Sequence, residues 1–243
     1  MTNESDSATC EAPVPGVMCP ICGSTFAGFA EFGVVKRKNA QCLSCESLER
    51  HRLLWKYLHD KTDLFRVKEP RRLLHFAPEK VFYNFFSKHP NIEYVPCDLY
   101  PDVYNYRGTV KIRQISITDI SFPDNYFDVV LCNHVLEHIP DDRRAMRELF
   151  RVIKKSGWGI FQVPVDYNRG TTYEDSSITS SEDRQKAFGQ SDHVRWYGRD
   201  YKDRLNSVGF DVTEDDYVKG FQPADLFKLG LKPSELIYKC SKP

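Results

Sequence analysis

The sequence predicts an α/β fold built on a largely parallel sheet, with a small cysteine-bearing module in front of it. From Arg71 onward, short apolar runs alternate with amphipathic segments, which is the pattern of β–α–β units. The segment before it carries two Cys-x-x-Cys pairs and then apolar residues at helical spacing. We therefore expect three parts, which are a disordered tail over residues 1–15, the module with its helix over 16–68, and the α/β domain over 69–243.

The composition narrows the class of protein. Lys plus Arg equals Asp plus Glu, at 34 each, so no global field directs the chain towards nucleic acid or an anionic membrane. No apolar run approaches the roughly 18 residues of a membrane span, and the polar start lacks the marks of a secretory signal. We expect a soluble cytoplasmic protein, in which paired cysteines usually bind metal.

The front module predicts a zinc site. Cys19 and Cys22 form one pair, Cys42 and Cys45 the other, with 19 residues between the pairs. This spacing lets two knuckles converge on one tetrahedral ion. Four thiolates fill the coordination shell, so the expected Zn²⁺ is structural or serves recognition. The alternatives are four buried cysteines without metal, and iron in a rubredoxin-like site.

Seven strands and three helices are expected after the module. The apolar runs place strands at residues 72–77, 92–96, 110–116, 127–133, 158–164, 209–218 and 235–240. Amphipathic segments place helices at residues 80–89, 143–155 and 199–209. The stretch from Asp166 to Arg195 is rich in Ser, Thr and Asp and too long for a simple connection, so we expect a lid there.

Residues at the predicted strand ends suggest a nucleoside site. A doubly wound sheet binds such cofactors at its carboxyl edge, with an acid after the second strand on the ribose. Asp98 follows the second run and can accept hydrogen bonds from both ribose hydroxyls. Ser116 and Ile117 end the third run, where an adenine would meet a polar edge and an apolar side chain.

The fourth run carries a family resemblance. Residues 121–164, SFPDNYFDVVLCNHVLEHIPDDRRAMRELFRVIKKSGWGIFQVP, resemble the central region of class I S-adenosylmethionine-dependent methyltransferases of the methyltransferase type 11 group. The resemblance implies a Rossmann-like sheet of seven strands, the last antiparallel, and S-adenosylmethionine as cofactor. It also implies that Asn133 and His134 line the cofactor pocket.

The first turn departs from the family pattern. Where the family has a glycine-rich turn, this chain has Leu-His-Phe-Ala-Pro-Glu at residues 74–79, without glycine. We expect His75, Phe76 and Ala77 to form this part of the site, with the small Ala77 letting the backbone approach the methionine part of the cofactor. Glu79 is expected to bind the methionine ammonium. An acid that often stands at the position of Ser116 is also missing.

The lid supplies candidates for catalysis. Methyl transfer is an in-line displacement, and a hydroxyl acceptor must also lose its proton. His193 is the predicted general base, because imidazole titrates nearest neutral pH. Asp192 or Glu174 would orient it, Tyr197 would bind the acceptor and Arg195 would hold an anionic group. The alternative is that these residues tie the lid to the sheet.

A second interpretation exists for His134-Val-Leu-Glu137-His138. The pattern matches the H-x-x-E-H signature of inverted zinc proteases, where the histidines lie within a helix. Here it directly follows a strand-like run, and Pro140 interrupts it before the next helix, which argues against a protease. The same three residues could hold a divalent ion, and His138 could instead be a pocket-wall or capping residue.

Three functions follow from these features. The first is a methyltransferase acting on a small molecule, through a hydroxyl of a sugar, lipid precursor or metabolite. The second is an RNA methyltransferase, in which Lys36-Arg37-Lys38 and Arg50-His51-Arg52 would contact the RNA phosphates. The overall charge neutrality of the chain disfavours it. The third is a non-catalytic zinc-ribbon binding module. A dehydrogenase is disfavoured because no G-x-G-x-x-G follows the first run.

Overall fold

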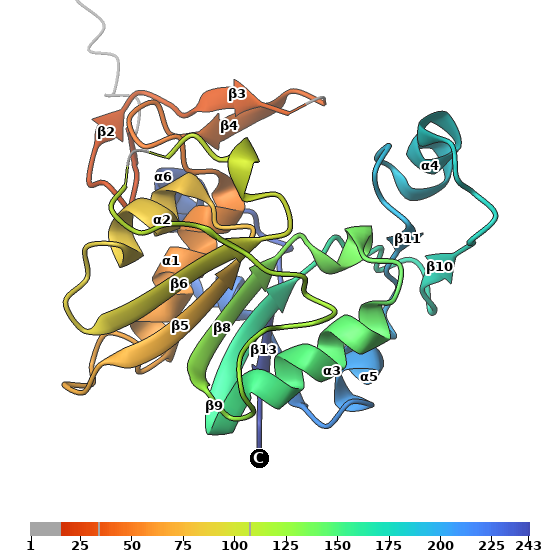
Figure 1. The fold of residues 1–243 in the computed structure, drawn as a ribbon. Helices are drawn as coiled ribbons and strands as arrows, with labels where there is room; N and C mark the ends of the chain where they lie inside the picture. The colour runs from red at the N-terminus through yellow and green to blue at the C-terminus, as the bar shows by residue number, and fades with distance from the viewer. Residues whose placement is uncertain (1–15, 34, 107) are drawn as a thin grey trace, which may run out of the picture.

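A seven-stranded sheet of order β12-β13-β9-β8-β5-β6-β7 forms the centre of the molecule (Figure 1). The computed structural model describes residues 16–33, 35–106 and 108–243, so the predicted tail lies outside the described residues. Strand β13 is antiparallel to both neighbours, and the others from β5 to β9 are parallel, which confirms the Rossmann-like prediction. The strands are β5 (Arg71–Phe76), β6 (Ile92–Asp98), β7 (Arg113–Gln114), β8 (Phe127–Asn133), β9 (Ile153–Gln162), β12 (Asp211–Asp215) and β13 (Ile237–Ser241).

Helices cover both faces of this sheet. On one face α3 (Asp142–Val152) and α5 (Tyr201–Asn206) pack apolar side chains into a core with β8 and β9. On the other face lie α1 (Glu49–Lys61) and α2 (Lys80–Phe86). Central strands buried on both faces explain the nearly continuous apolar runs of the sequence. The remaining helices are α4 (Ser181–Phe188), α6 (Pro223–Leu229) and the 3-10 turns η1 (Pro101–Val103), η2 (Leu136–His138) and η3 (Tyr217–Gly220).

Several predicted element boundaries are wrong. The helix expected over residues 143–155 ends at Val152, and Ile153 begins the long strand β9. Lys154 lies in that strand because its ammonium pairs with Asp128 at 2.9 Å on the neighbouring strand. The third strand shrinks from 110–116 to two residues, and the segment expected as strand 209–218 ends at Asp215 before a 3-10 turn.

The front module folds as two small hairpins that lead into α1. They pair β1 (Val17–Met18) with β2 (Thr25–Phe26) and β3 (Ala30–Phe32) with β4 (Arg37–Gln41). Arg52 of α1 is wholly buried and donates to the carbonyl oxygens of Ser47, Leu229 and Gly230 at 2.8–2.9 Å. The hypothesis that Arg52 contacts RNA phosphates is therefore wrong, since this guanidinium joins the module to the end of α6.

Residues 166–197, called the arm below, stand away from the sheet beyond β9 and carry α4 (Figure 1). Strands β10 (Tyr173–Glu174) and β11 (Arg195–Trp196) pair at its base. Ser180 caps α4 by accepting from the backbone N–H of Asp183, and Gly189 ends the helix at a φ of 83°. The arm occupies the segment expected as a lid. Among the described residues no helix is both long and apolar enough to cross a membrane.

Candidate functional site

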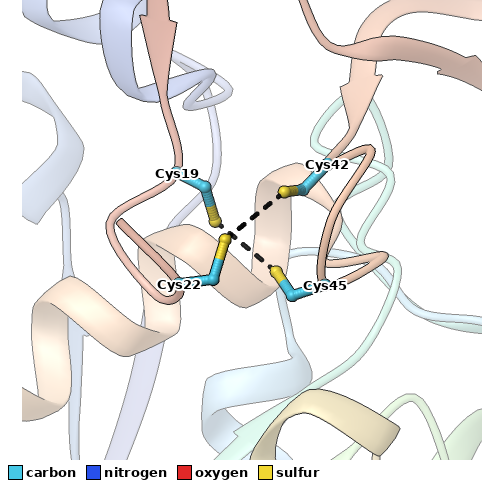
Figure 2. A group of neighbouring side chains, drawn as sticks. All are labelled: Cys19, Cys22, Cys42 and Cys45. Atoms are coloured by element: carbon cyan, nitrogen blue, oxygen red, sulfur yellow. Dashed lines mark hydrogen bonds between the residues drawn. The ribbon is translucent and has the colours of Figure 1, made fainter. Parts of the chain in front are cut away.

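The four paired cysteines come together in the module, next to Ser47 and the start of α1 (Figure 2). Their sulfur atoms all lie within 4.8 Å of one another, with Cys19 Sγ at 3.6 Å from Cys45 Sγ and Cys22 Sγ at 3.7 Å from Cys42 Sγ. Thiolates around a tetrahedral zinc ion at about 2.3 Å are about 3.8 Å apart. The donor set and its spacing therefore fit a closed zinc site.

Two turns at the carboxyl edge of the sheet have an unusual backbone. Ala77 follows β5 with a φ of 47°, and His134 follows the neighbouring β8 with a φ of 55°. Residues with a Cβ rarely adopt this left-handed region, and such conformations cluster at ligand sites. Hydrogen bonds hold both turns, from Ala77 N–H to the Cys97 carbonyl at 3.0 Å and from His134 N–H to the Gln162 carbonyl at 2.7 Å. The first turn thus takes a conformation that favours glycine although it contains none.

Glu79 presents a fixed carboxylate next to these turns. One oxygen lies 2.8 Å from Nε2 of His75, and the other accepts from the Asn133 amide at 3.3 Å. Burial by itself would raise the pKa of Glu79, but the hydrogen bond and charge of His75, with the charge of His51, lower that pKa to about 2. Glu79 is therefore an anion at neutral pH.

Arg50 of α1 lines the same small cavity as Glu79, Asn133 and His134. Its Nε is buried and has no hydrogen-bond partner in the part of the chain that the structure describes. Oδ1 of Asn133 and Nε2 of His134 are likewise buried and unpartnered there. Sequence reasoning missed Arg50 as part of this site, because nothing in the local pattern shows that α1 packs across the strand ends.

A larger cleft of about 510 Å³ adjoins this cavity through Arg50, His134 and Gln162. Its volume is in the range of small-molecule sites. The module, the strand ends, the arm and the segment before β13 all contribute to its wall, through Arg37, Glu49, Arg50, His134, Gln162, Val163, Pro164, Val165, Asp166, Tyr167, Asn168, Trp196, Lys232, Ser234, Glu235, Leu236 and Tyr238.

The residues predicted to hold the ribose and adenine lie at the ends of β6 and β7. Both oxygens of Asp98 are engaged, one by the Tyr104 hydroxyl at 2.7 Å and the other by the Tyr100 N–H at 2.8 Å. A ribose would take the place of Tyr104. Ser116 is half-buried and its hydroxyl lies 2.9 Å from that of Thr118.

Two residues of the first turn do not face the cavity as predicted. His75 is wholly buried, with Nδ1 at 3.0 Å from the Tyr94 hydroxyl and Nε2 on Glu79. His75 therefore positions Glu79 rather than contacting a cofactor. Phe76 and Ile117 both pack in the apolar core. Each could therefore contact a cofactor only with a small part of its side chain.

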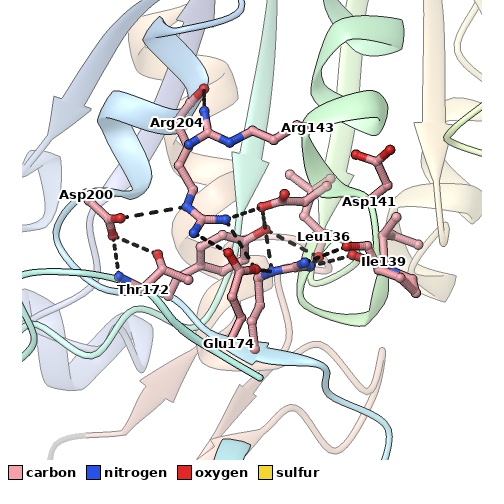
Figure 3. Close-up of polar contacts among 12 residues, drawn as sticks. Leu136, Ile139, Asp141, Arg143, Thr172, Glu174, Asp200 and Arg204 are labelled. Atoms are coloured by element: carbon pink, nitrogen blue, oxygen red, sulfur yellow. Dashed lines mark hydrogen bonds and ion pairs between the residues drawn. The ribbon is translucent and has the colours of Figure 1, made fainter. Parts of the chain in front are cut away.

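The arm residues mainly hold the arm in place. Tyr197 is wholly buried and donates to the Asp142 carboxylate at 2.8 Å, so the prediction that it binds an acceptor is wrong. Arg204 pairs with Asp142 at 3.0 Å and with Glu174 at 2.7 Å, while Arg195 pairs with Glu174 at 2.9 Å. Figure 3 shows Glu174 and Arg204 facing each other at the base of the arm. Glu174 is 41% exposed, whereas Asp142 and Arg195 are buried, and these ion pairs tie the base of the arm to α3 and α5.

His193 and Asp192 are not arranged as a base and its orienting acid. His193 is buried and lies outside the cleft wall, with Nδ1 at 3.2 Å from the Phe188 carbonyl. Asp192 instead pairs with Nδ1 of His138 at 3.3 Å. The zinc-protease alternative is also not supported, because Leu136–His138 is a 3-10 turn and not part of an α-helix.

Comparisons with known proteins agree with this geometry. Residues 85–161, from within α2 to near the end of β9, match the family model described as "Methyltransferase domain". The matched segment is therefore similar to methyltransferase domains. The chain is 38% identical over 48 residues to the uncharacterized methyltransferase YcgJ of Bacillus subtilis, covering 20% of this chain and 19% of that protein. It is 38% identical over 50 residues to the ubiquinone/menaquinone biosynthesis C-methyltransferase UbiE of Vibrio campbellii, covering 21% and 19%.

The chain thus spans about a fifth of the length of these curated relatives. Among solved structures, the [4+2]-cyclase SpnF is similar with a TM-score of 0.56 and 15% identity, covering 89% of this chain and 87% of that one. A SAM-dependent methyltransferase from Archaeoglobus fulgidus has a TM-score of 0.51 and 17% identity, covering 82% and 96%. At these identities the similarity shows that the methyltransferase domain has a shared fold.

Proposed function

We propose that this protein transfers the methyl group of S-adenosylmethionine to a small-molecule acceptor held in the cleft. The observation that carries the proposal is the pair of opposite charges at the strand ends. The ionised Glu79 and Arg50, whose Nε lacks a hydrogen-bond partner among the described residues, line one cavity beside the left-handed turn at Ala77. The methionine part of the cofactor is a zwitterion, so its ammonium suits Glu79 and its carboxylate suits Arg50.

The other predicted cofactor residues complete this proposal. Asp98 would accept the ribose hydroxyls once Tyr104 moves, and Ser116 and Ile117 would border the adenine. Asn133 and His134 would line the centre of the pocket, since their buried polar atoms lack partners among the described residues. The bound cofactor would supply an electrophilic sulfonium methyl group. The zinc ion proposed for the module would have a structural role only, because four cysteines fill its coordination shell.

His134 replaces His193 as the proposed general base. His134 lines both the small cavity and the cleft, and its Nε2 is free of hydrogen bonds to described residues. Its Nδ1 lies 3.5 Å from the buried Glu137 carboxylate, which would orient the ring. An acceptor hydroxyl in the cleft could therefore lose its proton to Nε2 while its oxygen faces the methyl group. We propose a hydroxyl of a sugar, lipid precursor or metabolite as the acceptor.

Calorimetry on the zinc-loaded full chain tests the cofactor site. We expect binding of S-adenosylmethionine and of its demethylated product, and a loss of about 10–100-fold in affinity in Glu79→Gln and in Arg50→Gln, since each variant removes a charged hydrogen-bonding group. The exposed variants Glu31→Gln and Lys36→Gln are matched controls and should bind like the wild type. No affinity for either molecule in the folded wild-type protein would refute the proposal.

Methyl transfer itself is tested with small-molecule extracts. Extracts incubated with enzyme and cofactor should contain a compound that has gained the mass of one methyl group, as seen by mass spectrometry. At saturating cofactor His134→Gln should abolish this product, because the variant lacks the base that takes the proton of the acceptor. A product that forms at the wild-type rate in His134→Gln would exclude His134 as the base.

A further inference from the structure

A second group of ligand-type side chains lies where the arm meets the sheet. Glu137, His138 and His193 each offer a ligand atom, and these three atoms lie within 4.8 Å of one another. Glu137 and His138 belong to η2, whereas His193 lies near the C-terminal end of the arm, just before β11. We propose that these three residues, called the arm site below, bind a divalent transition-metal ion. The arm site is separate from the four cysteines and does not depend on the proposed methyl transfer.

Glu137 provides the first argument. Its side chain is only 2% exposed, and Oε2 has no hydrogen-bond partner in the described part of the chain. The other oxygen lies 3.5 Å from Nδ1 of His134, which is at the outer limit of a hydrogen bond. A buried carboxylate with one long contact and one unpartnered oxygen is costly, because burial removes the water that solvates its charge. A bound cation would supply that missing interaction.

The two histidines provide the second argument. Nδ1 of His138 lies 3.3 Å from both the backbone carbonyl and the carboxylate of Asp192, and Nδ1 of His193 lies 3.2 Å from the Phe188 carbonyl. These three acceptors require Nδ1 to carry the proton, so Nε2 of each neutral ring has a free lone pair. Metal-bound histidines usually donate their other N–H to a carbonyl or carboxylate in this way. The surroundings of both rings are therefore those of metal ligands.

The donor set selects the kind of metal. Two imidazole nitrogens and one carboxylate oxygen suit Zn²⁺ and neighbouring transition metals, whereas Mg²⁺ and Ca²⁺ prefer oxygen ligands. Donors around Zn²⁺ at about 2.0–2.2 Å are separated by roughly 3.4 Å, so the three side chains would close slightly on the ion. Three protein ligands leave a fourth position for water or for an oxygen atom of a bound molecule. The ion would also join the arm directly to η2.

Metal stoichiometry tests the arm site in the full-length protein. After chelation and reloading with Zn²⁺, elemental analysis should find two equivalents in the wild type, one at the cysteines and one at the arm site. Glu137→Gln and His193→Gln should each retain one equivalent. His89→Gln, at a histidine near the start of β6 and far from the arm in sequence, is the matched control and should retain two. One equivalent in the wild type, or two in Glu137→Gln, would overturn the proposal.

Co²⁺ distinguishes the two sites spectroscopically. The equivalent bound by the cysteines should show a thiolate-to-cobalt charge-transfer band, and the equivalent bound at the arm site should show only weak visible bands. His138→Gln guards against a folding defect, because this side chain is 31% exposed and its loss should leave the melting curve of the apoprotein unchanged. If folded His138→Gln still takes up the second, non-thiolate equivalent with unchanged affinity, the assignment is wrong.

Discussion

Replacing Tyr197 by Phe separates a structural role from a catalytic one. The hydroxyl of Tyr197 is wholly buried and donates to the carboxylate of Asp142 at 2.8 Å. A hydrogen bond to a charged group contributes about 1.5–3 kcal/mol. The ring keeps its contact with Tyr201, at 4.7 Å between centroids, and Asp142 keeps Arg204 at 3.0 Å, so little further loss is expected. Tyr197→Phe should therefore lose about 1.5–3 kcal/mol of unfolding free energy.

Urea denaturation and thermal melting measure this change. For a chain of this length the loss corresponds to a melting temperature lower by about 3–12 °C. Tyr100→Phe is the matched control, because the Tyr100 side chain is exposed, and its stability should change by less than about 0.5 kcal/mol. The affinity of Tyr197→Phe for the demethylated cofactor should stay within a few-fold of the wild type. Wild-type stability combined with lost methyl transfer would refute the structural assignment.

Two other perturbations address the module. Burial lowers the pKa of His51 to about 4 in the folded protein. The unfolded chain therefore binds a proton at a higher pH than the folded chain does. The contribution of His51 to stability is full above about pH 6.5 and is lost as the pH falls towards 4. Between pH 6.5 and 5.5 the wild type should lose about 1 kcal/mol more than His51→Asn in urea titrations, and parallel curves would contradict this. Cys22→Ser should lose the thiolate-bound zinc and should melt at the same temperature as the chelator-treated wild type. A melting curve identical to that of the zinc-loaded wild type would exclude a structural zinc ion.

The sheet and the convergence of the four paired cysteines could be predicted because their signals are local. Apolar runs such as 127–133 are buried strands, and the Cys-x-x-Cys spacing defines its own geometry. The end of α3 could not be predicted, because Lys154 suits a helix C-terminus as well as a strand next to Asp128. The deciding contact, at 2.9 Å, joins residues 26 positions apart.

The candidate site was predictable only in part, for a similar reason. Asn133 ends β8, and His134 and Glu79 come after strands, so all three could be placed at the carboxyl edge of the sheet. Arg50 could not, because its position depends on how α1 packs against β5 and β8 through residues distant in sequence. The arm residues were misassigned because a polar, chemically capable segment has the same composition whether its groups face a ligand or one another. Tyr197 shows this, since only its burial in the folded protein reveals that its hydroxyl is already hydrogen-bonded within the protein.

The buried guanidinium of Arg52 makes the module inseparable from the rest of the chain. Three carbonyl groups from two distant segments share this one side chain, and its charged plane lies 4.0 Å from the Phe29 ring. A truncation that starts after residue 68 would remove the guanidinium together with the wall of the cleft that carries Arg50. Residues 16–68 therefore do not form an independent unit, and a domain without them should be less soluble and should lack Arg50 of the proposed cofactor site.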